Sequence, residues 1–162
     1  MAAAIEFERW VLEAAGKAGF MCEIVELGSG QCKLANACIK QETVCYTAID
    51  KDDYSDFADA GLNFIKGDML DYITKRKANI DICVADKSLN YLPYTELTEC
   101  LQGVAKLMGK DSQLIFSFFD LSIANESGAS KSIEARHKRL DPKIQALLGI
   151  YDELTLISVE EM

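Results

Sequence analysis

The chain has 162 residues and a mass of 17.9 kDa, which is the size of one ordinary domain. Hydrophobic residues make up 49% of the sequence and charged residues 27%, so a disordered or fibrous protein is excluded. The formal net charge of −9 and the pI near 4.6 argue against general electrostatic binding to nucleic acid or to an anionic membrane.

The first half of the chain alternates strand and helix signals. Short β-rich runs, each ended by glycine or aspartate, predict strands at Cys22–Leu27, Thr43–Ile49 and Leu62–Ile65. Apolar residues at helical spacing predict helices at 4–17, 31–40 and 69–75. A short polar helix or turn is expected at 52–60.

The second half continues the alternation. Ile80–Ala85 is apolar nearly throughout, as in a strand covered on both faces, and Gln113–Phe119 predicts a further strand. Between them, Pro93 opens an amphipathic helix that ends at Gly109. Beyond residue 120 we expect one helix and a last strand at 153–159.

This alternation predicts an α/β fold, a Rossmann-like three-layer α/β/α sandwich with a mostly parallel sheet of six or seven strands. We expect a single domain over 1–162, with an N-terminal helix in 1–20, a core in 21–120 and the helix and last strand in 121–162. The six cysteines form no CxxC pair and the chain has one histidine, so no metal site is expected. Without a signal peptide or an apolar stretch of about 18 residues, we expect a soluble cytoplasmic protein with no membrane segment.

A glycine-rich turn joins the first β-rich run to the next helix. Gly28 and Gly30 stand on either side of Ser29, where glycine allows a sharp turn and a close approach of the backbone to a ligand. The dinucleotide fingerprint GxGxxG needs a glycine where Lys33 stands, which disfavours a nicotinamide-dependent oxidoreductase. By itself the turn fits a structural role as well as a ligand site.

Carboxylates stand at three successive strand ends. Asp50 can accept hydrogen bonds from ribose hydroxyls, although aspartate is also a common turn residue. Asp68 can accept from an exocyclic amine while Met69 packs against an aromatic ring, or Asp68 can cap the helix that follows. Glu26 would lie near a cationic part of the ligand. Together they suit a ligand with an ammonium, a sulfonium and a ribose but no phosphate.

With these motifs the chain resembles the class I S-adenosylmethionine-dependent methyltransferases from about residue 20 to 120. The resemblance rests on Val25–Gln31, Tyr46–Asp50, Phe64–Leu70 and Ile80–Phe119. The segment Asp86–Leu92 is similar to the corresponding segment of small-molecule methyltransferases. The resemblance implies that S-adenosylmethionine is the cofactor and that its methyl group goes to an N or O nucleophile of a small molecule.

The resemblance also implies a role for each matching residue. Glu26, Gly28, Ser29 and Gly30 would line the methionine part of the cofactor. Asp50 would bind the ribose, with Lys51 beside it, and Asp68 and Met69 would hold the adenine. Ala85 and Asp86 would lie beneath the sulfonium. The family usually has glycine at the position of Cys32 and seven strands in its sheet.

On the substrate side, Asp86 or His137 would take a proton if the acceptor has one to lose. Asp86 equally fits a cap of the following segment, and the cationic stretch around His137 fits a solvated helix face. Tyr91 is expected to line the substrate pocket. The alternatives are methyl transfer to a basic protein and a non-catalytic binding or scaffold domain, which the departure at Cys32 favours.

Overall fold

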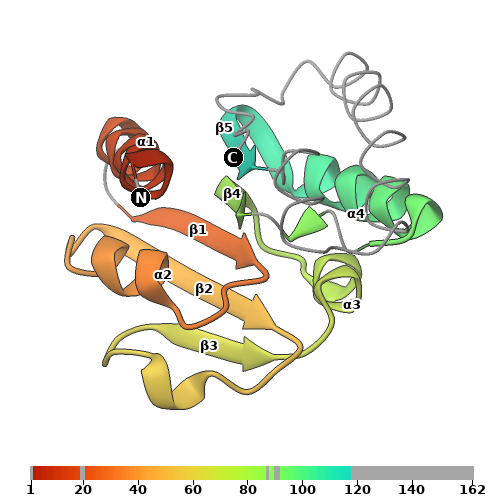
Figure 1. The fold of residues 1–162 in the computed structure, drawn as a ribbon. Coiled ribbons are helices and arrows are strands. Elements are labelled where there is room, and N and C mark those ends of the chain that lie inside the picture. Colours follow the sequence, from red (N-terminus) through yellow and green to blue (C-terminus); the bar gives the residue numbers. More distant parts are fainter. Residues whose placement is uncertain (1, 19–20, 87, 90–91, 118–162) are drawn as a thin grey trace.

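The computed structural model describes residues 2–18, 21–86, 88–89 and 92–117. In these residues the chain forms one five-stranded sheet with the order β3-β2-β1-β4-β5 (Figure 1). All four neighbouring pairs of strands run parallel. The strands are β1 (Cys22–Leu27), β2 (Val44–Asp50), β3 (Asn63–Lys66), β4 (Ile80–Asp86) and β5 (Met108–Ser117).

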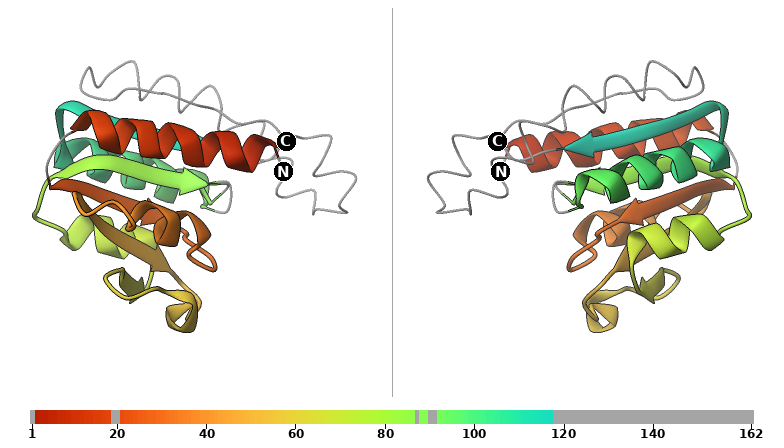
Figure 2. Two further views of the ribbon diagram at one scale, coloured as in Figure 1. Left: turned by 90° about the vertical axis from the view of Figure 1, so that its left-hand side faces the viewer. Right: turned by 90° about the vertical axis from the view of Figure 1, so that its right-hand side faces the viewer.

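Helices cover both faces of this sheet, as the two side views show (Figure 2). They are α1 (Ala2–Ala18), α2 (Lys33–Cys38), α3 (Met69–Lys75) and α4 (Tyr94–Leu107), with a short 3₁₀ helix η1 (Ser55–Phe57) after β2. The expected three-layer α/β architecture with a mostly parallel sheet is therefore confirmed.

Strand β4 shows why this sequence forms a sheet covered on both sides. Ile82 and Val84 pack with α1 and α2, whereas the alternate residues Cys83 and Ala85 pack with α3 and α4. All four side chains are at most 1% exposed. An unbroken apolar run is the pattern that a central parallel strand requires, since both of its faces are buried.

Most element boundaries differ from the prediction by one or two residues, and for two boundaries the structure shows the reason. Helix α2 is shorter than expected because Cys32 has a φ of 63°, outside the helical region, and the helix starts after it. Strand β5 begins at Met108, so the predicted start at Gln113 and the predicted end of the preceding helix at Gly109 are both wrong. Its register against β4 shifts between Ile80 and Ile82, and the hydroxyl of Ser112 donates to the carbonyl of Ile80 at 2.8 Å across this irregularity.

A sheet of six or seven strands is not reached within the described residues, which contain five. The strand expected at 153–159 and the helix before it lie outside them. No helix that the structure describes is long and apolar enough to cross a membrane.

The strand order places a crevice beside the glycine-rich turn. The chain adds β2 and β3 on one side of β1, and then returns to add β4 and β5 on the other side. In open parallel sheets, ligands bind outside the carboxyl ends of the strands at the point where the order reverses. That point lies between the ends of β1 and β4.

Candidate functional site

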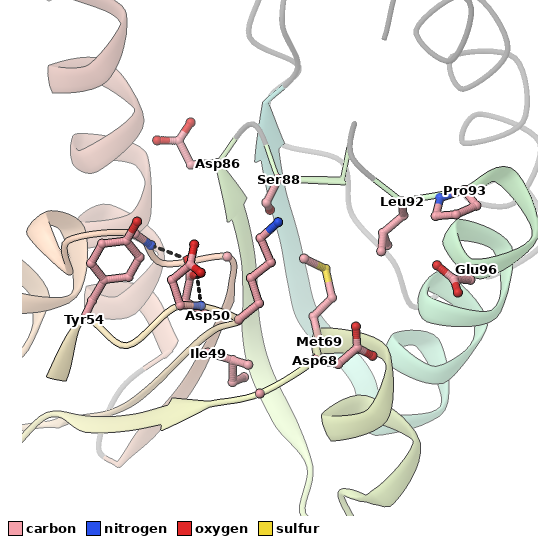
Figure 3. Close-up of a pocket in the computed structure, with 15 residues that line it drawn as sticks. Ile49, Asp50, Tyr54, Asp68, Met69, Asp86, Ser88, Leu92, Pro93 and Glu96 are labelled. Atoms are coloured by element: carbon pink, nitrogen blue, oxygen red, sulfur yellow. Dashed lines mark hydrogen bonds between the residues drawn. The ribbon is translucent and has the colours of Figure 1, made fainter. Parts of the chain in front are cut away.

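A cavity of about 560 Å³ opens at the carboxyl ends of the strands (Figure 3). Its walls come from the turns after the first four strands and from the start of α4. The lining residues are Gly28, Gly30, Ile49, Asp50, Lys51, Asp52, Tyr54, Gly67, Asp68, Met69, Asp86, Ser88, Leu92, Pro93 and Glu96. The volume lies within the range of about 300–1,000 Å³ that small-molecule and cofactor pockets have.

The turn after β1 is held by backbone bonds and leaves no room for a side chain at Gly28. The amides of Gly28 and Ser29 donate to the carbonyl of Ile49 at 2.8 and 3.0 Å. Gly28 has a φ of 81°, and a methyl group built on it would overlap with the Cβ of Ser88. The Ser88 hydroxyl in turn donates to the carbonyl of Leu27. The loop after β4 therefore rests directly on the glycine-rich turn.

Asp50 joins this turn to the end of β2. Its Oδ2 accepts from the amide of Gly30 at 2.8 Å, and its Oδ1 accepts from the amide of Asp52 at 3.0 Å. An ionised carboxylate has about four acceptor sites, so two remain for a ligand in the cavity. Asp50 thus both fixes the turn and presents acceptors at the strand end.

Asp68 performs the capping role that the sequence allowed. Its Oδ2 accepts from the amide of Asp71 at 2.9 Å, which caps the N-terminus of α3. Asp68 and the neighbouring Met69 also line the cavity. The cap and a ligand contact are compatible, because the cap occupies one oxygen of the carboxylate.

The cavity is strongly acidic. Its lining includes one lysine, Lys51, and five carboxylate residues, namely Asp50, Asp52, Asp68, Asp86 and Glu96. Such a wall favours a cationic ligand and opposes a phosphate. Among the described residues, no group of three or more histidine, cysteine, aspartate or glutamate side chains is arranged to hold a metal ion.

Three of the predicted cofactor residues, Glu26, Ser29 and Ala85, are not among those that line the cavity. Glu26 is 3% exposed and accepts a hydrogen bond from the hydroxyl of Tyr46 at 2.8 Å. The pKa of Glu26 is raised to about 8, chiefly by burial and to a smaller extent by the charges of Asp86 and Asp50, while the Tyr46 bond acts in the opposite direction. Ala85 is fully buried in the core, and neither it nor Ser29 is among the lining residues. Their contacts with a ligand stay predictions.

Cys32 occupies a conformation that favours glycine. Its φ of 63° and ψ of 23° lie in the left-handed region, its side chain is fully buried, and its Sγ lies 3.6 Å from the carbonyl oxygen of Gly30. The left-handed region costs a residue other than glycine about 1–2 kcal/mol. Part of the energy of burying the thiol therefore offsets backbone strain.

We expect Cys32→Gly to be at least as stable as Cys32→Ala, and Cys32→Val to be the least stable of the three. Both small replacements lose the buried thiol, but glycine also removes the left-handed strain, worth about 1–2 kcal/mol. Valine keeps the strain and adds a branched side chain. Urea unfolding of the three variants checks the order. An alanine variant more stable than the glycine variant by over about 1 kcal/mol would show that the strain is small.

Solved structures with the same fold are methyltransferases. The fold aligns with the N-methyltransferase NodS from Bradyrhizobium japonicum, in complex with S-adenosyl-l-homocysteine, with a TM-score of 0.63 and 14% identity over 85% of this chain and 74% of NodS. It aligns with the plantazolicin methyltransferase BpumL in complex with SAH, with a TM-score of 0.68 and 17% identity over 92% of this chain and 63% of BpumL. The methyltransferase domain of bacterial CtHen1-C gives a TM-score of 0.62 and 14% identity over 89% and 82% of the two chains.

The fold is that of the class I S-adenosylmethionine-dependent methyltransferases. At these identities the likeness shows the methyltransferase fold alone. No protein-family model matches the sequence, and no curated protein matches it. The chain spans less than two thirds of BpumL.

Within this methyltransferase fold, the cavity brings together most of the predicted site residues. Those that line it are Gly28, Gly30, Asp50, Lys51, Asp68, Met69 and Asp86. Tyr91 and His137 lie outside the described residues. Tyr54, in a loop, and Glu96, in the first turn of α4, line the cavity but were not predicted from the sequence. Asp52 was not predicted either, although its position two residues after Asp50 is a signal that it lies near the same strand end.

Proposed function

We propose that this protein binds S-adenosylmethionine in the cavity and transfers its methyl group to an N or O nucleophile of a small molecule. The observation that carries the proposal is the junction of Gly30 and Asp50 at the edge of the cavity. A glycine without a side chain and a carboxylate with spare acceptors meet there, beside the reversal of strand order. A ribose and the chain attached to it need this combination.

The described residues fit the cofactor. A Cβ built on Gly30 meets nothing within 4 Å, so the backbone there is open to a close ligand. Asp68 and Met69 would hold the adenine, and Asp50 with Lys51 would hold the ribose. The acidic lining suits the positive sulfonium and ammonium groups. When bound, S-adenosylmethionine supplies an electrophilic methyl group; the chain's residues bind it, orient it and restrict water.

Methyl transfer to a neutral amine or a phenol also requires the loss of a proton. Asp86 lines the cavity at the end of β4 and is the base we propose among the described residues. His137 remains a second proposed base and Tyr91 a proposed substrate contact. Most of the barrier can be lowered by positioning alone.

The proposed substrate class rests on the solved structures that share the fold, which include the N-methyltransferase NodS and the plantazolicin methyltransferase BpumL. The acidic charge of the chain makes a nucleic acid a poor partner. We further propose that the chain is a single domain and acts in the cytoplasm.

The proposal is tested by release of S-adenosylhomocysteine from S-adenosylmethionine in the presence of separate pools of small amines, small phenols and a basic protein. Turnover with a small-molecule pool supports the proposal, and turnover with the protein alone supports protein methylation instead. Cofactor binding without turnover in any pool would favour the non-catalytic binding domain.

Replacement of Asp50 by alanine should weaken binding of S-adenosylhomocysteine by about 1–3 kcal/mol, because charge-assisted hydrogen bonds to the ribose are lost. Asp81→Ala is the matched control. Asp81 also accepts from a backbone amide, that of Glu23 at 2.9 Å, and it does not line the cavity. Isothermal titration calorimetry gives both affinities. Equal affinities for the two variants would contradict the ribose role of Asp50.

A further inference from the structure

The loop between β2 and β3 is joined to α2 by one side-chain amide. The Nδ2 of Asn36 donates to the carbonyl of Phe57 at 2.8 Å, and its Oδ1 accepts from the amide of Asp59 at 2.9 Å. Asn36 lies in the middle of α2, and it does not line the cavity. Both bonds go to main-chain atoms, so they fix the path of the loop and not one side chain.

Apart from these bonds, the loop has few apolar contacts with the rest of the domain. From Lys51 to Asp59 all side chains are exposed except Tyr54 and Ala58, which are half-buried and pack against the core cluster that includes Ala35. Phe57 is 50% exposed, although its ring lies 6.1 Å from that of Tyr54. A segment with few buried apolar contacts depends on its hydrogen bonds for a fixed position.

The same loop forms one wall of the cavity. Asp52 and Tyr54 both line it, and Figure 3 shows the ring of Tyr54 on the same side of the cavity as Asp50. Hydrogen bonds from side chains outside the loop therefore hold it at two points. Asp50 binds its start through the amide of Asp52, and Asn36 binds its end at 57–59. Tyr54, which forms part of the cavity wall, lies between these two points.

We propose that Asn36 is a positioning residue for the cofactor cavity, which acts by holding Tyr54 in the wall beside Asp50. The identity of the ligand rests on the function proposed above; the hydrogen bonds of Asn36 do not. If the cavity wall is already ordered in the free protein, binding does not include the entropic cost of ordering that wall. Loss of Asn36 then weakens binding through Tyr54, with no direct contact between Asn36 and the ligand.

The affinity test is a double-mutant cycle for S-adenosylhomocysteine, measured by calorimetry on wild type, Asn36→Ala, Tyr54→Ala and the double variant. We expect Asn36→Ala to weaken binding about three- to tenfold in the presence of Tyr54, and less than about twofold in its absence. The control is Asn63→Ala. Asn63 donates to the hydroxyl of Thr47 at 3.3 Å and does not line the cavity, so its loss should leave the affinity unchanged.

Amide hydrogen exchange tests the same inference without ligand. In Asn36→Ala we expect faster exchange at the amide of Asp59, and at the amides of Phe57 and Ala58, which donate to Tyr54 and Ser55, than in wild type or Asn63→Ala. If wild type binds no S-adenosylhomocysteine and exchange at the loop still quickens, the proposed cofactor is wrong and the positioning of the loop is supported. Unchanged exchange, or equal loss of affinity with and without Tyr54, would overturn the role of Asn36.

Discussion

Replacement of Gly30 by alanine should strongly weaken cofactor binding and leave the protein folded. Gly30 lines the cavity, has a φ of 54°, and would place an added methyl group in open space and not against the protein. The methyl would occupy space that a closely bound ligand needs. We expect the dissociation constant for S-adenosylhomocysteine to rise at least about thirtyfold. The cost to folding should be the left-handed strain alone, about 1–2 kcal/mol.

Gly61→Ala separates these two effects. Gly61 also has a positive φ, 94°, and a methyl group there also meets nothing within 4 Å, but Gly61 does not line the cavity. The two variants should therefore lose similar stability in urea unfolding, while Gly61→Ala keeps its affinity within about twofold. Comparable affinities for the two variants would show that the ligand does not approach Gly30.

The second large effect concerns Glu26 and the dependence of stability on pH. Burial raises the pKa of this carboxyl to about 8 in the folded protein, so the folded state keeps a proton that the unfolded chain releases near pH 4.5. The contribution of this carboxyl to the free energy of unfolding is fully present below about pH 4.5 and is lost as the pH rises through about 8. In between, the free energy of unfolding falls by up to about 1.4 kcal/mol per pH unit.

Glu26→Gln should remove this dependence. Glutamine keeps an acceptor for the Tyr46 hydroxyl but cannot ionise. Between pH 6 and pH 8, wild type should lose about 2 kcal/mol of unfolding free energy relative to the variant, as measured by urea unfolding at each pH. Glu23→Gln, on the same strand and with a side chain 40% exposed, controls for the loss of one acidic residue. If the difference in unfolding free energy between wild type and Glu26→Gln stays the same from pH 6 to pH 8, the burial of a protonated Glu26 is contradicted.

Much of the fold could be predicted because its strong patterns are local. The β-rich run at Cys22–Leu27 and the helix at Met69–Lys75 match β1 and α3 at both ends. The predicted start of β5 was wrong because the glycine and polar residues at 109–112 are typical of a turn. In the structure the hydroxyl of Ser112 donates to the carbonyl of Ile80, and the strand continues past the irregularity. Such a long-range contact leaves no local signal.

The site was predictable where topology alone places a residue. Gly28, Asp50 and Asp68 follow three parallel strands, so their convergence needs no knowledge of side chains. The position of Glu26 was not predictable in the same way. β1 is buried on both faces, so alternation cannot tell which side chain turns toward the cavity and which toward Tyr46. Tyr54 was missed because an irregular loop carries it.

The most direct test of the account is a calorimetric titration of the wild-type chain with S-adenosylhomocysteine, with NAD as the control ligand. We expect roughly micromolar affinity for S-adenosylhomocysteine and no detectable binding of NAD, because the acidic cavity opposes its phosphates. Binding of neither ligand, by a protein shown to be folded, would contradict the assignment of the cavity to this cofactor.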